Sequence, residues 1–166
     1  MSFAAKLDLE LVTKTLIIFG QRIGPDDAIN LLPRFDTSGP CLDGNVFTRT
    51  TKLIPKDTAR QAWVSGIRWH LHPNADGTWS IPNQNQPDFC LAGVKEKPTL
   101  LAQGANMQDD PTKWLIYYNA RLKAFALRPL KNAWLAVGQD GPGLAPLNSS
   151  GDPAAMWVFA PHGLEI

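Results

Sequence analysis

The chain has few cysteines, little net charge and no long hydrophobic run. Two cysteines in 166 residues cannot form a disulfide framework. A formal net charge of +1, with no cluster of lysine and arginine, gives no field that would attract nucleic acid or an acidic membrane. No stretch of about 18 apolar residues is present, so we expect no membrane span. The sequence therefore argues against a nucleic-acid-binding protein, an integral membrane protein and a disulfide-rich domain.

The first residues, MSFAAKLDLELVTK, include acidic side chains and lack the apolar core and small-residue cleavage site of a secretory signal. We therefore expect a cytoplasmic protein, with non-classical release as an alternative.

Prolines and glycines are frequent and spread along the chain. Fourteen prolines and thirteen glycines separate many short apolar runs, which is the pattern of an all-β sandwich or barrel. A chain of 166 residues suits one domain, since a domain of this size buries roughly 70% of its unfolded surface.

Three units of similar length repeat along the chain, and each ends in a tryptophan. The spacing is 22 residues from Cys41 to Trp63, 24 from Cys90 to Trp114 and 23 from Trp134 to Trp157. Pro33 and Pro82 each stand eight residues before a cysteine, which supports the alignment of the first two units. Repeats of this length predict a fold that stacks or closes copies of one small unit.

Each unit is expected to hold four strands. They fall at residues 28–34, 40–44, 46–52 and 62–72, at residues 77–82, 89–93, 99–105 and 113–119, and at residues 124–129, 133–138, 143–148 and 156–161. The first and fourth strands of each unit would line a six-stranded barrel, and the second and third would form three hairpins that cap it. Closing the barrel removes exposed strand edges.

The repeated tryptophans are expected to pack in the core. Burying three symmetry-related rings contributes on the order of 2 to 3 kcal/mol each. We expect Trp134 in the core as well, whereas Trp69 and Trp79 fall in a hairpin where they could be exposed. Cys41 and Cys90 occupy equivalent repeat positions, and we expect both to be buried free thiols.

Residues 1–25 belong to no repeat, and residues 26–166 form the repeated domain. Residues 15–19, TLIIF, are expected to form a thirteenth strand in this N-terminal extension. The strand could pair at the barrel rim beside the last strand, pack on the outside, or join a second subunit. We favour an extension ordered on the same molecule and keep a homodimer as an alternative.

The first repeat has a strand, the letters CLD, another strand and then Gln-x-Trp, in that order. It resembles a repeat of the ricin B-type β-trefoil family. QAW at residues 61–63 matches the whole signature, and TKW and AMW keep the tryptophan. CLDG at residues 41–44 is similar to the second strand of that family, and GDPAAMWVF at residues 151–159 is similar to its closing segment. The resemblance covers about residues 26 to 162 and implies an all-β fold, a β-trefoil with three four-stranded repeats. The N-terminal extension strand is an addition to that fold in this chain.

The resemblance also implies a shallow sugar site. In that family an Asp of the second strand accepts hydrogen bonds from sugar hydroxyls and an aromatic ring stacks on the apolar sugar face. Asp43 matches the Asp, Phe47 is the nearest aromatic residue, Gln61 fits the signature Gln, and Asn45 completes the candidate set.

The matches are incomplete outside the first repeat. Ala92 and Ala136 replace the Asp, so at most one family-type site remains, because a site without its polar group loses selectivity for a hydroxyl. The Asn that the family places before the tryptophan is also missing. Arg60, Pro111 and Ala154 stand three residues before the repeat tryptophans.

Other polar groups favour structural roles. His70 and His72 point to one face of a strand near Asp76, a geometry that suits a metal, but polar alternation of a solvated strand is the favoured interpretation. The aspartates at 109, 110 and 152 are expected in turns. The amide-rich loop of residues 83–88 is interpreted as a solvated turn, with a contact surface as the alternative.

No nucleophile elbow, phosphate loop or zinc motif is present, so we expect a non-enzymatic protein without a cofactor or metal. The favoured function is lectin-like binding of a glycan or glycoprotein. The alternative is a protein-binding trefoil with decayed sugar sites, acting as a hydrolase inhibitor or as a subunit of a toxin or larger assembly.

Overall fold

The structure is a computed structural model that describes residues 9–18, 20–35, 40–45, 47–55, 66–93, 98–102, 111–130, 133–138, 141–145 and 153–161. Its elements are β1 (Leu9–Val12), β2 (Leu16–Ile18), β3 (Gln21–Ile23), β4 (Ile29–Pro33), β5 (Cys41–Asn45), β6 (Thr50–Ile54), β7 (His72–Pro73), β8 (Trp79–Ser80), β9 (Pro82–Asn83), β10 (Gln86–Gly93), β11 (Pro98–Ala102), β12 (Lys113–Asn119), β13 (Ala124–Pro129), β14 (Trp134–Gly138), β15 (Gly141–Ala145), the short 3₁₀ helix η2 (Pro153–Ala155) and β16 (Trp157–Pro161).

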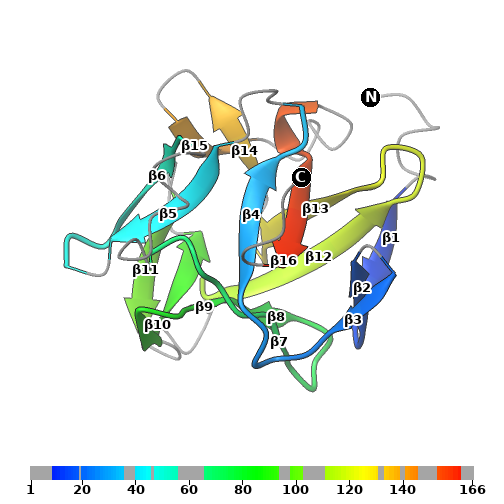
Figure 1. Cartoon of the computed structure of the whole chain (residues 1–166), viewed down its shortest axis with the longest axis horizontal. Helices are drawn as coiled ribbons and strands as arrows, with labels where there is room; N and C mark the ends of the chain where they lie inside the picture. The colour runs from blue at the N-terminus through cyan, green and yellow to red at the C-terminus, as the bar shows by residue number, and fades with distance from the viewer. Residues whose placement is uncertain are drawn as a thin grey trace.

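A closed barrel forms the centre of the molecule (Figure 1). Its strands follow the order β4, β16, β13, β12, β8 and β7. Closure comes from the segment that leads into β7, because Ile29 and Trp69 exchange two backbone hydrogen bonds of 2.9 Å. The predicted barrel of first and fourth strands is therefore confirmed.

Three antiparallel hairpins cap this barrel, and they are β5–β6, β10–β11 and β14–β15. Thr50 of β6 pairs with Thr99 of β11, and β15 lies against both β6 and β11. The hairpins therefore meet one another, as expected for three copies of one unit arranged around an axis.

One buried tryptophan in each repeat makes the same hydrogen bond. Trp69, Trp114 and Trp157 are each fully buried, and each indole N–H donates to the carbonyl of a leucine in the hairpin of its own repeat. The leucines are Leu42 at 3.0 Å, Leu91 at 2.8 Å and Leu135 at 2.8 Å. One bond of the same kind in each repeat anchors the hairpin to the barrel.

Trp69 therefore takes the place that the sequence assigned to Trp63, which lies outside the described residues. The chain separation between leucine and tryptophan is 27 residues in the first repeat, against 23 and 22 in the others. The first repeat carries a longer connection, and extra loop length costs little free energy. The assumption that all three repeats have the same length therefore identified the wrong tryptophan in the first repeat.

Trp69 and Trp79, which the sequence left open to exposure, are both buried, with 0% and 2% of their surfaces exposed. Trp79 pairs with Trp114 and donates its indole N–H to the carbonyl of Val12 at 2.7 Å. Trp134 is buried, as expected, with Tyr117 edge-on at a centroid distance of 5.6 Å.

The described part of the N-terminal extension packs on the barrel of the same molecule. β1 runs antiparallel to β12, from the pair Leu9 and Asn119 to the pair Val12 and Ile116. Residues 16–18 form a hairpin with β3 instead of pairing at the rim, and Leu16, Ile18 and Ile23 join the main core. In Figure 1 these dark blue strands lie at the lower right, beside β12.

Cys41 and Cys90 are both buried and do not form a disulfide with each other, as expected. Each lies at an equivalent position in its hairpin, one residue before the leucine that accepts an indole hydrogen bond.

Candidate functional site

The hairpin β5–β6 carries three of the four residues expected to bind sugar. Asp43 and Asn45 lie two apart on β5 and so share one face of the strand. Phe47 lies in the following turn with 89% of its surface exposed. Gln61 falls outside the described residues. The structure thus brings a carboxylate and a bare aromatic ring to one hairpin.

Asn45 builds the turn that presents Phe47. Its side-chain Oδ1 accepts hydrogen bonds from the backbone N–H of Phe47 at 2.9 Å and of Thr48 at 3.2 Å. The Arg49 N–H donates to the Asn45 carbonyl at 2.7 Å, and Arg49 adopts the left-handed conformation with φ of 59°. Asn45 therefore positions the aromatic ring, and its amide oxygen is already engaged.

Asp43 is half-buried beside Lys52, its partner across the hairpin. Burial raises the pKa of the Asp43 carboxyl, and the charge of Lys52 acts in the opposite direction. A carboxylate that is partly shielded from water makes stronger hydrogen bonds to a ligand.

Gly66 gives the Asp43 carboxylate its room. A Cβ atom on Gly66 would stand 2.4 Å from Asp43 Oδ1 and 2.6 Å from the Gly44 carbonyl oxygen. Gly44 also donates its N–H to the Gly66 carbonyl at 3.0 Å. No side chain longer than that of glycine fits here while Asp43 keeps its place.

Position 66 is the true equivalent of Pro111 and corrects the alignment of the first repeat. Gly93 donates to the Pro111 carbonyl at 3.0 Å, as Gly44 does to Gly66, and each acceptor lies three residues before its buried tryptophan. Gly66, and not Arg60, therefore stands where the ricin B-type family that the sequence resembles has its Asn. The expectation that this Asn is missing holds for the corrected position as well.

With the same corrected alignment, Gln61 no longer falls at the Gln position of the Gln-x-Trp signature. Two residues before Trp69 stands Ile67, of which 1% is exposed, and the matching positions hold Thr112 and Ala155, both fully buried. The first repeat thus has the tryptophan of the signature, Trp69, but no Gln two residues before it.

The first and second hairpins are joined beside the site. The Arg49 guanidinium lies 4.5 Å from the centroid of the Phe89 ring. The Thr99 hydroxyl donates to the Arg49 carbonyl, and the Thr51 hydroxyl donates to the Pro98 carbonyl at 2.9 Å. These contacts between the two hairpins stabilise β6, the strand that pairs with β5 at Asp43.

The other two hairpins carry alanine at the Asp43 position. Ala92 pairs with Thr99 and Ala136 pairs with Gly143, just as Asp43 pairs with Lys52. Ala92 is fully buried and 8% of Ala136 is exposed. Neither position presents a polar group to a ligand.

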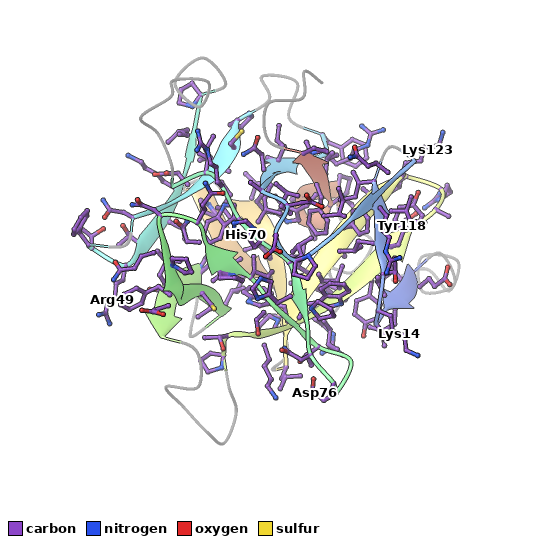
Figure 2. The ribbon with its side chains drawn as sticks, turned by 60° about the horizontal axis from the view of Figure 1, so that its bottom comes forward. Lys14, Arg49, His70, Asp76, Tyr118 and Lys123 are labelled. Carbon is purple, nitrogen blue, oxygen red and sulfur yellow. The ribbon has the colours of Figure 1, made fainter. Side chains whose placement is uncertain are left out.

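His70, His72 and Asp76 lie in and around the turn between Trp69 and β8, and Figure 2 shows His70 apart from Asp76 at the bottom of the view. The two imidazole rings are 6.4 Å apart, and His72 Nε2 lies 3.1 Å from the Pro25 carbonyl oxygen. In the described ranges, no three His, Cys, Asp or Glu side chains gather as a metal site would need. His70 Nδ1 is buried and has no hydrogen-bond partner among the described residues.

Asp76 shapes the turn between β7 and β8. Its carboxylate accepts hydrogen bonds from the backbone and hydroxyl of Thr78 and from Lys113 at 2.8 Å. The hydrogen bond from Lys113 is the largest cause that holds the pKa of Asp76 well below its usual range, and those from Thr78 act in the same direction. The aspartates 109, 110 and 152 lie outside the described residues.

The amide-rich loop splits into a buried and an exposed part. Asn83 is fully buried, donates its amide to the Gly66 carbonyl at 2.9 Å and accepts from the Asn85 N–H at 3.0 Å. Gln86, Pro87 and Asp88 are exposed at the start of β10. The protruding part is therefore shorter than the sequence suggested.

Among the described residues, no helix is both long and apolar enough to cross a membrane.

No protein-family model and no curated protein sequence matches the chain. Solved structures do match. Cytolethal distending toxin from Actinobacillus actinomycetemcomitans aligns over 86% of this chain and 95% of that chain, with a TM-score of 0.67 and 13% identity. Cry35Ab1 aligns over 87% of this chain but 38% of that chain, with a TM-score of 0.66 and 14% identity. SeviL bound to asialo-GM1 saccharide aligns over 82% of this chain and 98% of that chain, with a TM-score of 0.59 and 11% identity.

The chain has a β-trefoil fold. The barrel, the three hairpins and the repeated tryptophan bonds confirm the architecture that the sequence predicted. At these identities the similarity concerns the fold alone, and the chain spans less than half the length of Cry35Ab1.

Proposed function

We propose that this β-trefoil is a non-enzymatic carbohydrate-binding module that holds a glycan or glycoprotein at the hairpin β5–β6. The observation that carries the proposal is that one hairpin presents both a half-buried carboxylate, Asp43, and the exposed ring of Phe47. The other two hairpins have alanine at the Asp43 position.

The two side chains supply complementary parts of sugar recognition. An ionised carboxylate accepts hydrogen bonds from neighbouring hydroxyls, and such charge-assisted bonds contribute roughly 1.5 to 3 kcal/mol each. The Lys52 ammonium beside Asp43 adds a donor for a hydroxyl oxygen. The Phe47 ring offers an apolar face on which the C–H groups of a pyranose can pack.

A single site predicts weak monovalent binding. Linking sites raises avidity by 10²-fold or more without new contacts, so a homodimer or a larger assembly would strengthen binding to a multivalent glycan. The saccharide bound to SeviL shows that a protein of similar fold can hold a sugar, which is in keeping with the proposal.

A glycan array with matched variants tests this function. Asp43→Ala and Phe47→Ala should each reduce the array signal of the wild-type chain while its thermal melt stays unchanged. Asp88→Ala removes an exposed carboxylate from β10 and is the matched control, which should bind like wild type. Loss of signal in the control as well would contradict an assignment to the β5–β6 hairpin.

The alternative function is a protein-binding trefoil, either a hydrolase inhibitor or a subunit of a toxin or larger assembly. The fold similarity to cytolethal distending toxin favours the second form. Exposed Leu11 and Ile17 in the N-terminal extension would suit a protein contact. A wild-type chain that binds no glycan on the array would favour this alternative.

A further inference from the structure

A pocket lies between the N-terminal hairpin and the barrel, and no residue of the β5–β6 hairpin lines it. Its volume is about 340 Å³, at the lower end of the range for small-ligand sites. Six residues that line it are Gln21, Ile23, Asp27, Arg68, Gln84 and Pro161. In Figure 1, β3 at the lower right lies far from the turn after β5 at the far left, whereas Arg68, on another wall of the pocket, is two residues from Gly66, which lies against Asp43.

The walls of this pocket are tied together by the backbone. Gln84 donates its N–H to the Arg68 carbonyl at 2.9 Å. The adjacent Trp69 exchanges two hydrogen bonds with Ile29, and Ile29 pairs with Pro161 of β16. Segments from both ends of the chain are therefore held in fixed positions around the space, which lowers the entropy that a ligand must overcome.

Polar groups with unused hydrogen-bonding capacity face this space. Asp27 Oδ2 accepts a hydrogen bond from the Gly24 N–H at 2.7 Å, which fixes the carboxylate. Within the described part of the chain, Asp27 Oδ1 and the side-chain amides of Gln21 and Gln84 make no hydrogen bond. A ligand can therefore satisfy them without breaking an internal contact.

The chemistry of the lining selects a neutral ligand rich in hydroxyls. The lining includes one cation, Arg68, and one anion, Asp27, so their charges cancel. A carboxylate only accepts and an amide both donates and accepts, and a hydroxyl can serve both because it also donates and accepts. Ile23 and Pro161 add an apolar wall suited to C–H groups.

We propose that this pocket binds a neutral sugar of monosaccharide size, at a site independent of the β5–β6 hairpin. The inference extends the proposed function to a second place in the fold. It does not depend on Asp43, because no residue of that hairpin lines the pocket.

Backbone amide NMR of the ¹⁵N-labelled chain tests the inference. The probes are D-galactose, D-glucose, D-mannose and N-acetyl-D-glucosamine, with cationic D-glucosamine and anionic D-glucuronic acid as charged controls. At least one neutral sugar should shift the amides of Gln21, Arg68 and Gln84, with saturation at or below about 10 mM, and the charged sugars should bind more weakly.

Matched variants locate the effect. Gln21→Trp fills the pocket from an exposed position, and Gln84→Ala removes one amide, so each should weaken binding at least about tenfold. Arg22→Trp places the same ring on the next, exposed residue of β3, which faces the opposite side of the strand, and should leave binding unchanged. Asp43→Ala should leave these shifts intact, so failure of the hairpin site and failure of the pocket are distinguishable. Shifts confined to β5–β6, preference for a charged sugar, or no shift at the pocket would overturn the inference.

Discussion

The Trp69 indole N–H donates to the Leu42 carbonyl at 3.0 Å, and this bond identifies Trp69 as the core tryptophan of the first repeat. Equivalent bonds join Trp114 to Leu91 and Trp157 to Leu135. Each ring fills the core and also ties a hairpin to the barrel, so its removal leaves a cavity and takes away the hydrogen bond to the leucine carbonyl.

We predict that Trp69→Ala and Trp114→Ala each lower the free energy of unfolding by about 3 to 5 kcal/mol, as truncation of a buried aromatic ring does. Urea denaturation measures the change. Similar losses in the two variants are expected because the two rings have the same partner type and are both fully buried. A midpoint that Trp69→Ala leaves unchanged would show that Trp69 does not hold this position.

Gly66→Ala should destabilise the chain by about 1 to 3 kcal/mol, because the added methyl group meets both Asp43 Oδ1 and the Gly44 carbonyl oxygen. Gly24→Ala is the matched control, since its Cβ would meet its nearest neighbour at 3.5 Å, an ordinary contact. Thermal denaturation of both variants compares them. Equal melting temperatures would mean that Asp43 does not pack over Gly66.

Asp76 is expected to make stability depend on acid. Because its folded-state pKa is lowered from 3.8, its contribution is present above that pH and is lost as the pH falls toward the folded pKa. Asp76→Asn should therefore destabilise the chain at pH 7 by less than about 1 kcal/mol, since the pair with Lys113 is partly exposed and screened by salt. The gap between wild type and variant should shrink below pH 3.8 in denaturation curves measured from pH 2 to 7. A constant gap would argue against an electrostatic role.

Both cysteines should react with iodoacetamide after unfolding without a reductant, and neither should react readily in the folded chain. Burial of the two thiols is the reason. Intact mass spectrometry counts the labels. Unfolded protein that takes up no label would reveal a disulfide.

Local patterns in the sequence predicted most of the fold. The Cys-Leu pairs, the spaced prolines, Trp114 and Trp157 mark strands whose period is visible in the letters. Trp69 was missed because Gln61 and Trp63 match the family signature, and because the burial of Trp69 depends on partners far along the chain, such as Leu42, 27 residues away, and Ile29. Leu9–Val12 was missed as a strand because its acidic residue and short length give a weak signal, whereas its pairing with β12 is a contact across the chain.

The candidate site was predictable in its residue types and less so in its geometry. Asp43 and Phe47 could be found from the letters around CLDG. The roles of Lys52 and Gly66 required the pairing register and the close approach of two backbones, and the turn-forming role of Asn45 required its hydrogen bonds.

Calorimetric titration of wild type and Asp43→Ala with the strongest glycan from the array tests the proposed function most directly. The account predicts that the variant keeps its melting temperature and binds at least about tenfold more weakly, a loss of about 1.4 kcal/mol. Equal affinity in the two proteins, or no glycan bound by the wild-type chain, would contradict it.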